Sequence, residues 1–326
     1  MPKKESLIVA YILDGKGGGR RVDWDGVQSW TPDQGLLWVH LNYTSNKAKN
    51  WLKKESGIDH IAARAMTLSS DESRPRCVLH KESFLIFLRG VNLNPGEDPE
   101  DMVSIRMLIE KNRIITTRQR RLLSIDDIRE TIESGQGPCS SSEFFIRLND
   151  RLIHRMSDVI DQVYERVDSL EEAVISEESY LLRPQIAEIR RQSILIRRYL
   201  APQREALNQL QLEGVPLLSR LDRMYLREGT DRIVRYIEDL DSARDRASIV
   251  QEELASRLSE QMNKRMYILA LVAVIFLPLS FITGLLGINV GGIPGAEHQY
   301  GFAIVCTLLV ILTIGIVFLL HRKKWM

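Results

Sequence analysis

Two uncharged apolar runs near the C-terminal end constrain the fold of this chain more than any other feature. Met266 to Leu286 and Gly301 to Leu320 contain 21 and 20 residues without an Asp, Glu, Lys or Arg. A helix of about 20 apolar residues crosses the roughly 30 Å hydrocarbon core of a bilayer. A buried helix of a large soluble core is the alternative, but charged residues flank both runs. We predict a transmembrane helix over 266–287 and a second one, followed by a basic tail, within 300–326.

The basic residues around these runs indicate how the chain crosses the membrane. Residues 288–299 contain no Lys or Arg, whereas basic residues precede the first run and follow the second: Arg246, Arg257, Lys264, Arg265, Arg322, Lys323 and Lys324. Because segments rich in Lys and Arg stay in the cytoplasm, both termini are expected to be cytoplasmic, in a multi-pass protein of the inner (plasma) membrane. The Gly- and Pro-containing connection 288–299 is then a short outer loop.

Residues 1–142 are expected to form a cytoplasmic α+β domain, a mixed sheet flanked by helices. Short apolar or β-branched runs bounded by Gly, Pro and Asn predict strands at Leu7–Leu13, Leu36–Leu41, Phe84–Val91, Val103–Ile109 and Arg113–Thr117. Helical patterns cover Lys47–Glu55, Asp59–Leu68 and Ser124–Ser134. Ser124 is the expected N-cap of the last of these helices.

Residues 143–265 are expected to be wholly helical. Residues 158–178 are mostly acidic and residues 183–204 mostly basic, and Pro184 suits the first turn of a second helix. An antiparallel hairpin of opposite charge is the simpler interpretation, and an acidic surface at subunit contacts that senses divalent cations is the alternative. From residue 217 to 286 apolar residues step by three or four. This pattern predicts one continuous stalk helix that becomes the first transmembrane helix.

Composition and motifs exclude several function classes. The chain has 44 basic and 43 acidic side chains, a net charge of +1, which argues against a nucleic-acid partner. Its three cysteines lie far apart, so neither a disulfide framework nor a cysteine zinc site is predicted. The glycine-rich loop Asp14–Gly19 matches neither phosphate-binding pattern and is expected to be a flexible hairpin loop. A GxSxG elbow is absent, and we predict that the chain is not an enzyme and holds no cofactor.

The first apolar run carries small or polar residues at intervals of three and four, with Leu277 filling the one gap: Ala270, Ala273, Ser280, Thr283, Gly284 and Gly287. Close helix packing in membranes favours small residues too, so two interpretations stand. In the second, this face lines a pore in which Ser280 and Gly284 admit water. Leu277 and Met266 then form apolar constrictions, and Asn263 meets the cytosol. Because two spans cannot enclose a water-filled path, such a pore requires a cyclic oligomer.

The triplet Gly287-Ile288-Asn289 ends this helix and is the predicted selectivity filter and pore mouth. A ring of asparagine carbonyls suits a cation that keeps its water shell, because an amide oxygen accepts hydrogen bonds from bound water. Glu297 and His298 are the only titratable groups of the outer loop. Repeated around an axis, they are expected to attract cations, and His298 is expected to respond to pH.

These features together resemble the CorA family of divalent metal ion transporters, and among them the zinc-transporting ZntB branch. The resemblance rests on the long helix that enters the first span, the GxN triplet, the short loop and the basic tail, and it covers essentially the whole chain. The usual triplet is Gly-Met-Asn, and Ile288 in place of methionine is similar to the ZntB branch. Four further stretches are similar to that branch: Asp14–Gly18, Ser73–Arg76, Thr117–Arg120 and Ser193–Gln203.

The resemblance implies a funnel-shaped homopentamer with the stalk helix lining the pore. It adds Leu269 to the pore-lining positions already inferred, so that the full set reads Asn263, Met266, Leu269, Leu277, Ser280 and Gly284. Zinc prefers nitrogen and sulfur ligands, which this face lacks, so the ion is expected to pass hydrated. No metal-ligating residue is assigned.

Three functions remain open from the sequence. The leading one is zinc transport through the pentameric pore, coupled to the proton gradient as the resemblance implies, with Mg²⁺, Co²⁺, Ni²⁺ and Cd²⁺ as further candidate cargo. The second is a magnesium, cobalt or nickel channel gated by cytosolic metal. The third is a membrane-anchored sensor or scaffold, in which Ser280 and Asn289 would be dispensable. The expected partners are other copies of the chain, divalent metal ions and the lipid membrane.

Overall fold

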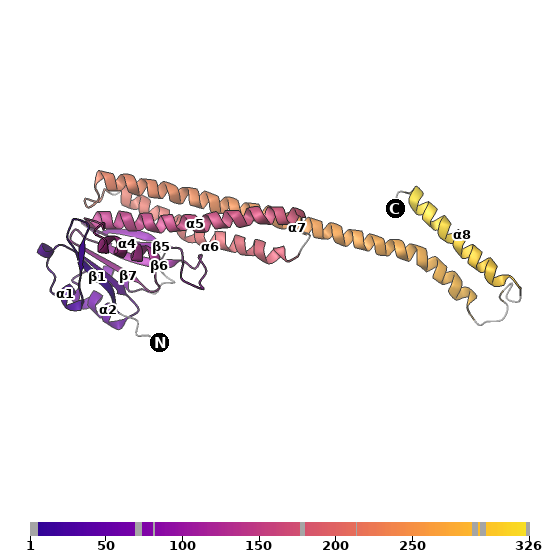
Figure 1. Ribbon diagram of the computed structural model, residues 1–326, viewed down its shortest axis with the longest axis horizontal. Coiled ribbons are helices and arrows are strands. Elements are labelled where there is room, and N and C mark those ends of the chain that lie inside the picture. The colour runs from indigo at the N-terminus through magenta and orange to yellow at the C-terminus, as the bar shows by residue number, and fades with distance from the viewer. Residues whose placement is uncertain are drawn as a thin grey trace. The chain divides into compact units, whose positions relative to one another are not determined.

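The computed structural model describes residues 6–68, 74–80, 82–176, 180–212, 214–288, 293 and 298–323. The chain forms two compact units, the first ending at Gln251 and the second beginning at Glu252. The first unit holds a β-sheet and a bundle of long helices, and the second holds two apolar helical segments (Figure 1). The segment boundaries that the sequence predicts at residues 142 and 265 stay predictions.

A seven-stranded mixed sheet forms the core of the first unit. Its strands are β1 Leu7–Leu13, β2 Gly19–Arg21, β3 Leu36–Asn42, β4 Arg76–His80, β5 Ser83–Gly90, β6 Val103–Ile109 and β7 Arg113–Arg118. The strand order is β2-β1-β3-β7-β6-β5-β4. β3 and β7 pair in parallel, and the other neighbours pair antiparallel. The sheet is therefore mixed, as the sequence predicts.

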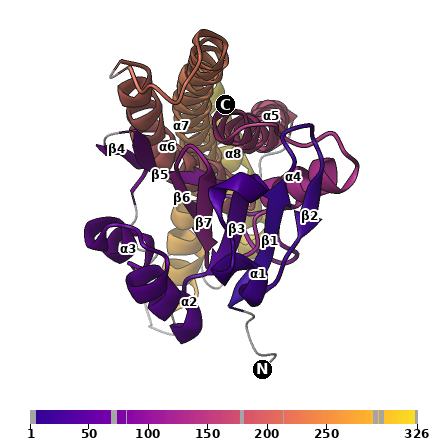
Figure 2. The same ribbon diagram turned by 90° about the vertical axis from the view of Figure 1, so that its left-hand side faces the viewer.

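Both faces of the sheet are buried, which explains why its strands are almost continuously apolar. Along β1, Tyr11 and Leu13 face one hydrophobic cluster while Ala10 and Ile12 face the other. The first cluster includes α4 (Leu123–Glu133) and α5 (Ser141–Ser176), and the second includes α2 (Asn46–Asn50), the adjoining helical turn Trp51–Glu55 and α3 (His60–Met66). Figure 2 shows the two groups of helices on opposite sides of the sheet.

Three long helices follow the sheet: α5, α6 (Leu182–Leu212) and α7 (Arg220–Leu286). Pro184 lies in the first turn of α6, as predicted. In the first unit α5 and α7 lie side by side (Figures 1 and 2). They run in the same direction, as the order of two ion pairs shows: Asp150 pairs with Arg232, and Asp168 pairs with Arg246. α7 continues without a break to Leu286, which confirms the single stalk helix.

The charged runs of α5 and α6 are both tied to α7. Arg246 of α7 lies 2.5 Å from Asp168 and 2.6 Å from Glu171 of α5. Arg197 of α6 lies 2.7 Å from Asp241 of α7. The expected antiparallel hairpin is present, but at these residues the opposite charges meet at α7 rather than across the hairpin. Because the pairs are partly exposed, each contributes under about 1 kcal/mol.

Carboxylates of α5 and α7 lie near each other between the Asp150–Arg232 and Asp168–Arg246 ion pairs. Asp239 of α7 is close enough to Asp161 of α5, and to its own neighbour Glu238, for their charges to act on it. Burial raises the pKa of Asp239, and these two carboxylates raise it further, while a hydrogen bond with Tyr164 and the charge of Arg235 lower it. The ionised Asp239 therefore weakens the contact between α5 and α7.

We expect Asp239→Asn to stabilise the protein at neutral pH. The folded pKa lies above the unfolded value of 3.8, so the folded state binds more protons and stability falls as pH rises through that window. The variant should gain about 0.5 kcal/mol, the scale of like-charge neighbours on helices, and the gain should vanish in acid. Thermal unfolding from acid to neutral pH measures it. Asp231→Asn, at an exposed position of α7, is the control, and a gain independent of pH would contradict the prediction.

Some elements differ from the sequence predictions. The patterns miss β2, β4 and the short helix α1 (Trp24–Gln28). The expected N-cap at Ser124 is wrong, because Leu122 is the N-cap of α4 and Ser124 lies buried inside the helix.

The glycine-rich loop joins β1 and β2 as a hairpin, but it is held in place rather than flexible. Asp14 Oδ1 accepts hydrogen bonds from the N–H groups of Lys16 (2.7 Å) and Gly18 (3.0 Å). The Gly137 N–H donates to the Gly17 carbonyl at 2.7 Å. Gly17 has a φ of 102°, and a Cβ there would lie 2.6 Å from the carbonyl oxygen of Gly135. Only glycine fits this close approach.

Gly17→Ala is expected to destabilise the first unit more than Gly57→Ala. Gly57 also has a positive φ, 68°, but a Cβ there meets no heavy atom within 4 Å. We expect about 1 kcal/mol for Gly57→Ala from the left-handed backbone alone, and about 2–3 kcal/mol for Gly17→Ala because a clash is added. Denaturant unfolding of the two variants compares them, and equal losses would show that the loop moves aside freely.

Candidate functional site

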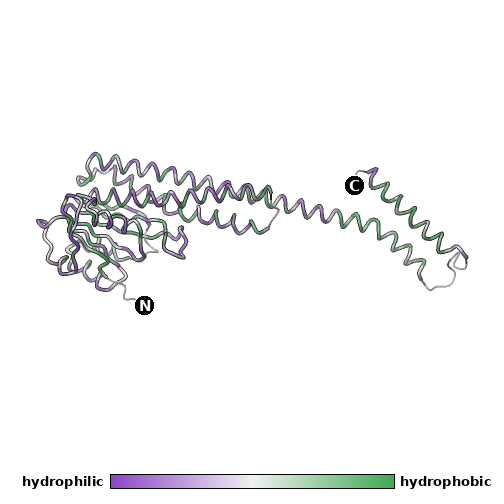
Figure 3. The backbone as a smooth tube through the Cα atoms, in the orientation of Figure 1, coloured by the Kyte–Doolittle hydropathy of each residue, from purple (hydrophilic) through white to green (hydrophobic). Residues whose placement is uncertain are grey.

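The second unit contains the end of α7 and the helix α8 (Gly301–Arg322). Both helices are long and apolar enough to cross a membrane, and Figure 3 shows apolar residues along both. Large apolar side chains are exposed there in the single chain, for example Leu269 at 71% and Phe302 at 85%. Such a surface requires lipid or protein around it. The two uncharged runs therefore form the helices that the sequence predicts.

The candidate pore residues of α7 share one face of the helix. They are all exposed: Asn263, Met266, Leu269, Leu277, Ser280 and Gly284. At about 100° per residue they fall within about a third of the helix circumference. The helix is unbroken through Pro278, so the face is continuous. Along this face Asn263, Ser280 and Gly284 alternate with the larger apolar side chains of Met266, Leu269 and Leu277.

Backbone and side-chain hydrogen bonds of α7 itself satisfy the groups at its C-terminal end. The Gly287 N–H donates to the carbonyls of Thr283 (2.9 Å) and Gly284 (3.2 Å). The Thr283 hydroxyl donates to the carbonyls of Leu279 (3.0 Å) and Ser280 (3.1 Å), so the helix itself satisfies this hydroxyl. A Cβ at Gly284 would meet no heavy atom within 4 Å. In the single chain, this position of the face therefore has room for a larger side chain.

The predicted filter is described in part. Gly287 and Ile288 directly follow α7, and Ile288 is 48% exposed. Asn289 and Glu297 lie outside the described residues. The roles of all four residues stay predictions.

His298 lies at the start of α8. Its Nδ1 accepts a hydrogen bond from the Tyr300 N–H at 3.2 Å, and its carbonyl accepts one from the Gly301 N–H at 2.8 Å. A protonated imidazole would lose the first of these bonds, because both ring nitrogens then carry protons. His298 thus helps to begin α8, a contact that no sequence pattern indicates.

In the described residues, the groups that could contact an ion on α7 are neutral oxygens rather than a cluster of metal-ligating side chains. Among them, no three His, Cys, Asp or Glu side chains lie close enough together to hold a metal ion. The face of α7 instead presents the Asn263 amide and the Ser280 hydroxyl. Neutral oxygens of this kind accept hydrogen bonds from the water shell of a cation. The arrangement suits passage of a hydrated ion better than tight binding of a bare one.

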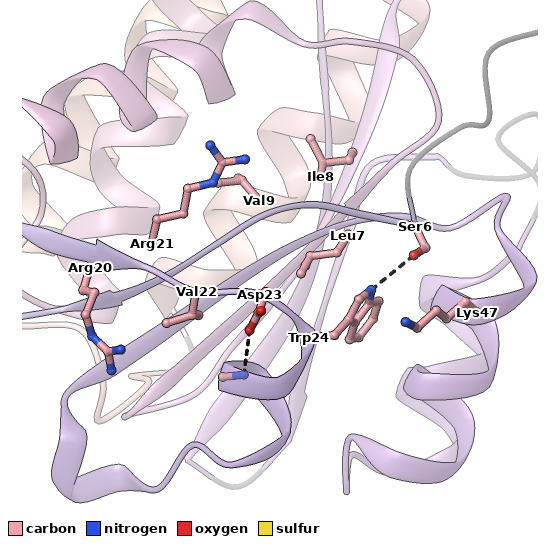
Figure 4. Close-up of a pocket in the computed structure, with 11 residues that line it drawn as sticks. Ser6, Leu7, Ile8, Val9, Arg20, Arg21, Val22, Asp23, Trp24 and Lys47 are labelled. Carbon is pink, nitrogen blue, oxygen red and sulfur yellow. Dashed lines mark hydrogen bonds between the residues drawn. The ribbon is translucent and has the colours of Figure 1, made fainter.

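A separate hollow lies at the edge of the sheet, beside β1, β2 and α1. Figure 4 shows Arg20 and Arg21 pointing away from each other. Trp24 donates to the Ser6 hydroxyl at 3.3 Å, and the Lys47 ammonium lies 4.8 Å from the centre of the Trp24 ring. Because the two guanidinium groups do not converge, they do not form an anion site. Charged residues on a short edge strand also discourage pairing with other chains.

Comparison with known proteins identifies the family. The family model described as "CorA-like Mg2+ transporter protein" matches residues 33–322. The "Divalent cation transporter CmaX" of Pseudomonas aeruginosa is 40% identical, over 94% of this chain and 92% of its own length. The "Zinc transport protein ZntB" of Yersinia enterocolitica is 35% identical, over 98% and 96%. The structure of full-length CmaX superposes with a TM-score of 0.84 and 37% identity, covering 99% of both chains.

The matches span both the sheet domain and the apolar helices, so the likeness is not confined to one unit. These relatives are ion transporters and not enzymes, in agreement with the lack of catalytic motifs in the sequence. The chain therefore belongs to the CorA family of divalent metal ion transporters.

Proposed function

We propose that this protein transports zinc across the inner membrane through a homopentameric pore lined by α7. The observation that carries the proposal is the continuous face of α7 from Asn263 to Gly284, exposed in the single chain along an apolar helix. The choice of zinc is supported by 35% identity, over nearly the whole length, to a zinc transport protein.

Physical constraints support an oligomer and an orientation in the membrane. One chain supplies two apolar helices, too few to enclose water, so several copies must surround the path with one α7 each. The basic residues that flank the helices support a cytoplasmic location for both termini. The number of five copies and the funnel shape are carried over from the resemblance to the CorA family.

The ion passes in a largely hydrated form. Asn289, repeated around the axis, offers a ring of amide oxygens to the water shell, with Gly287 and Ile288 at the pore mouth. Glu297 and His298 concentrate cations at the outer entrance, and protonation of His298 reduces that attraction. If Asn289→Ala retains wild-type uptake and ion preference, this assignment of the filter is wrong.

Coupling to the proton gradient is tested by zinc uptake into liposomes that carry the purified protein and a lumenal pH dye. Uptake that grows with an imposed pH gradient and carries protons supports coupled transport. Uptake indifferent to the gradient indicates a passive channel. Protein-free liposomes are the control for leakage.

A magnesium, cobalt or nickel channel gated by cytosolic metal is the second candidate, and the description of the matched family model as a Mg²⁺ transporter favours it. The same liposomes distinguish the two: magnesium uptake that exceeds zinc uptake selects the channel. Absence of flux for every divalent cation tested would favour the membrane-anchored sensor.

A further inference from the structure

Basic side chains gather in the second unit at the ends of the two apolar segments that lie away from the connection between α7 and α8. This basic cluster consists of five exposed residues: Lys264, Arg265, His321, Arg322 and Lys323. At about 1.5 Å per residue, Lys264 lies about 33 Å before the end of α7 and Arg322 lies about 32 Å after the start of α8. Each distance matches the roughly 30 Å thickness of the hydrocarbon core of a bilayer.

The half-buried side chains of the two apolar segments show which faces of the helices meet. In α7 they fall within about a third of the helix circumference: Leu271, Ile275, Pro278, Leu279 and Ile282. In α8 the half-buried and buried side chains also share one face: Val305, Cys306, Leu309, Leu312, Thr313, Ile316, Val317 and Leu320. Among the described residues, the second unit holds no other helix. These two faces therefore cover each other, and α8 runs back antiparallel to α7.

Two lysines of the basic cluster continue these meeting faces. Lys264 precedes Leu271 and Ile275 by 7 and 11 residues, about two and three helical turns, so it lies on the α8 side of α7. Lys323 follows Ile316 by 7 residues and lies on the α7 side of α8. Because the helices are antiparallel, the two ammonium groups come to the same membrane surface and the same side of the hairpin.

The charges of the basic cluster are not neutralised within the described part of the chain. None of its five side chains makes an ion pair there, and this includes Glu260, one turn before Lys264. Further from the apolar segment, by contrast, Arg257 pairs with Glu253 at 2.6 Å. The dipole of α8 accounts for cations at its C-terminal end, but it does not account for Lys264, which lies in the interior of α7.

Exposed apolar side chains adjoin the basic cluster on its hydrocarbon side. Ile268 of α7 is 54% exposed, and Phe318 and Leu319 of α8 are 64% and 56% exposed. Each of them lies about one helical turn from a basic residue of its own helix. A free phosphate in water gains nothing from such neighbours. A phospholipid, however, places its acyl chains beside them and its phosphate at the level of the cations.

We propose that the basic cluster binds the phosphate groups of anionic phospholipids between Lys264 and Lys323. Ammonium groups bind phosphate as point charges, and basic residues beside membrane helices attract anionic headgroups. At about 100° per residue, Lys264 lies about 160–200° around α7 from Ser280 and Gly284, so the lipid site faces away from the candidate pore face. The inference goes beyond ion transport and requires only that the two apolar helices lie in a membrane.

Native mass spectrometry of the full-length protein in a non-ionic detergent tests the proposal by counting retained lipids. Dioleoylphosphatidylglycerol and dioleoylphosphatidylcholine have the same acyl chains, and only the first has a net charge. We expect the first to bind at least about tenfold more tightly. sn-Glycerol 3-phosphate, which has the phosphate without acyl chains, is expected to leave no adduct at the same concentration. Equal retention of the two lipids, or equal binding of glycerol phosphate, would overturn the proposal.

Variants assign the lipid to this cluster. Lys264→Gln and Lys323→Gln each remove one exposed charge and are each expected to weaken phosphatidylglycerol binding about fivefold. Arg257→Gln also removes one charge from α7, about 10 Å further along the helix, and is the matched control that should bind as the wild type does. Unchanged binding by the double variant of Lys264 and Lys323, or an equal loss in Arg257→Gln, would contradict the assignment. The readout is lipid retention, so the result does not depend on whether zinc is the transported ion.

Discussion

Replacing Gly284 by leucine is expected to abolish most ion uptake. A Cβ at Gly284 meets no heavy atom within 4 Å, so leucine fits the single chain without a clash. Repeated around a pore axis, however, the leucines form an apolar constriction, which closes a path by expelling its water. An added barrier of about 1.4 kcal/mol slows a process tenfold, and we expect a loss of that order or larger in zinc uptake by liposomes.

Gly315→Leu in α8 is the matched control. A Cβ at Gly315 also meets no heavy atom within 4 Å, and both substitutions replace a helical glycine by a better helix former. Uptake by Gly315→Leu is expected to stay near the wild-type level. An equal loss in both variants would mean that bulk anywhere in the membrane region impairs flux. Wild-type uptake by Gly284→Leu would contradict the pore face.

The interior strands could be predicted because a strand that is buried on both faces appears in the sequence as a run of consecutive apolar residues. β1 and β6 begin and end at the predicted residues. β2 has the sequence Gly-Arg-Arg and becomes a strand through its pairing with β1. β4 is the opposite edge strand, and its exposed Val78 breaks the apolar pattern. Edge strands form through hydrogen bonding to a neighbouring strand, so their own residues do not show an apolar strand pattern.

Helix starts depend on capping residues, and the sequence contains a capping pattern at the start of α7 that the predicted start at residue 217 does not use. α7 begins at Arg220 rather than at residue 217. Ser219 Oγ accepts from the Asp222 N–H at 3.1 Å, and Asp222 Oδ2 accepts from the Ser219 N–H at 2.9 Å. This reciprocal pattern, with an acidic residue three positions after a serine, is a known start signal. At α4 the error was the reverse, since Ser124 points into the buried side of the helix.

The candidate pore face could be predicted because helical periodicity alone puts its residues together. The contact between α5 and α7 could not, because Asp150 and Arg232 are more than 80 positions apart and neither belongs to a motif. Their proximity depends on the register of two parallel helices, which the Arg232–Asp150 and Arg246–Asp168 pairs reveal in the structure.

The largest loss of stability is expected for Trp38→Ala. Trp38 of β3 is fully buried and joins the sheet to the helical bundle. Its ring centre lies 5.9 Å from that of Tyr11 and 4.9 Å from that of Phe144 in α5, and its Nε1 donates to Thr116 Oγ1 at 2.9 Å. Removing such a side chain costs about 3–5 kcal/mol, out of a total of about 5–15 kcal/mol. Denaturant unfolding of the full-length protein measures the loss.

Trp30→Ala is the control, because Trp30 is only half-buried while its Nε1 also donates a hydrogen bond, to the Gly35 carbonyl at 3.1 Å. We expect Trp30→Ala to lose well under half of the stability that Trp38→Ala loses. Equal losses would contradict the larger contribution that we assign to the buried side chain of Trp38. Trp38 contributes no atom to the candidate pore face. At temperatures where Trp38→Ala stays folded, its zinc uptake should therefore match the wild type, and uptake should fail only as the first unit unfolds. Loss of uptake by a folded Trp38→Ala would instead mean that the seating of α5 on the sheet controls the pore.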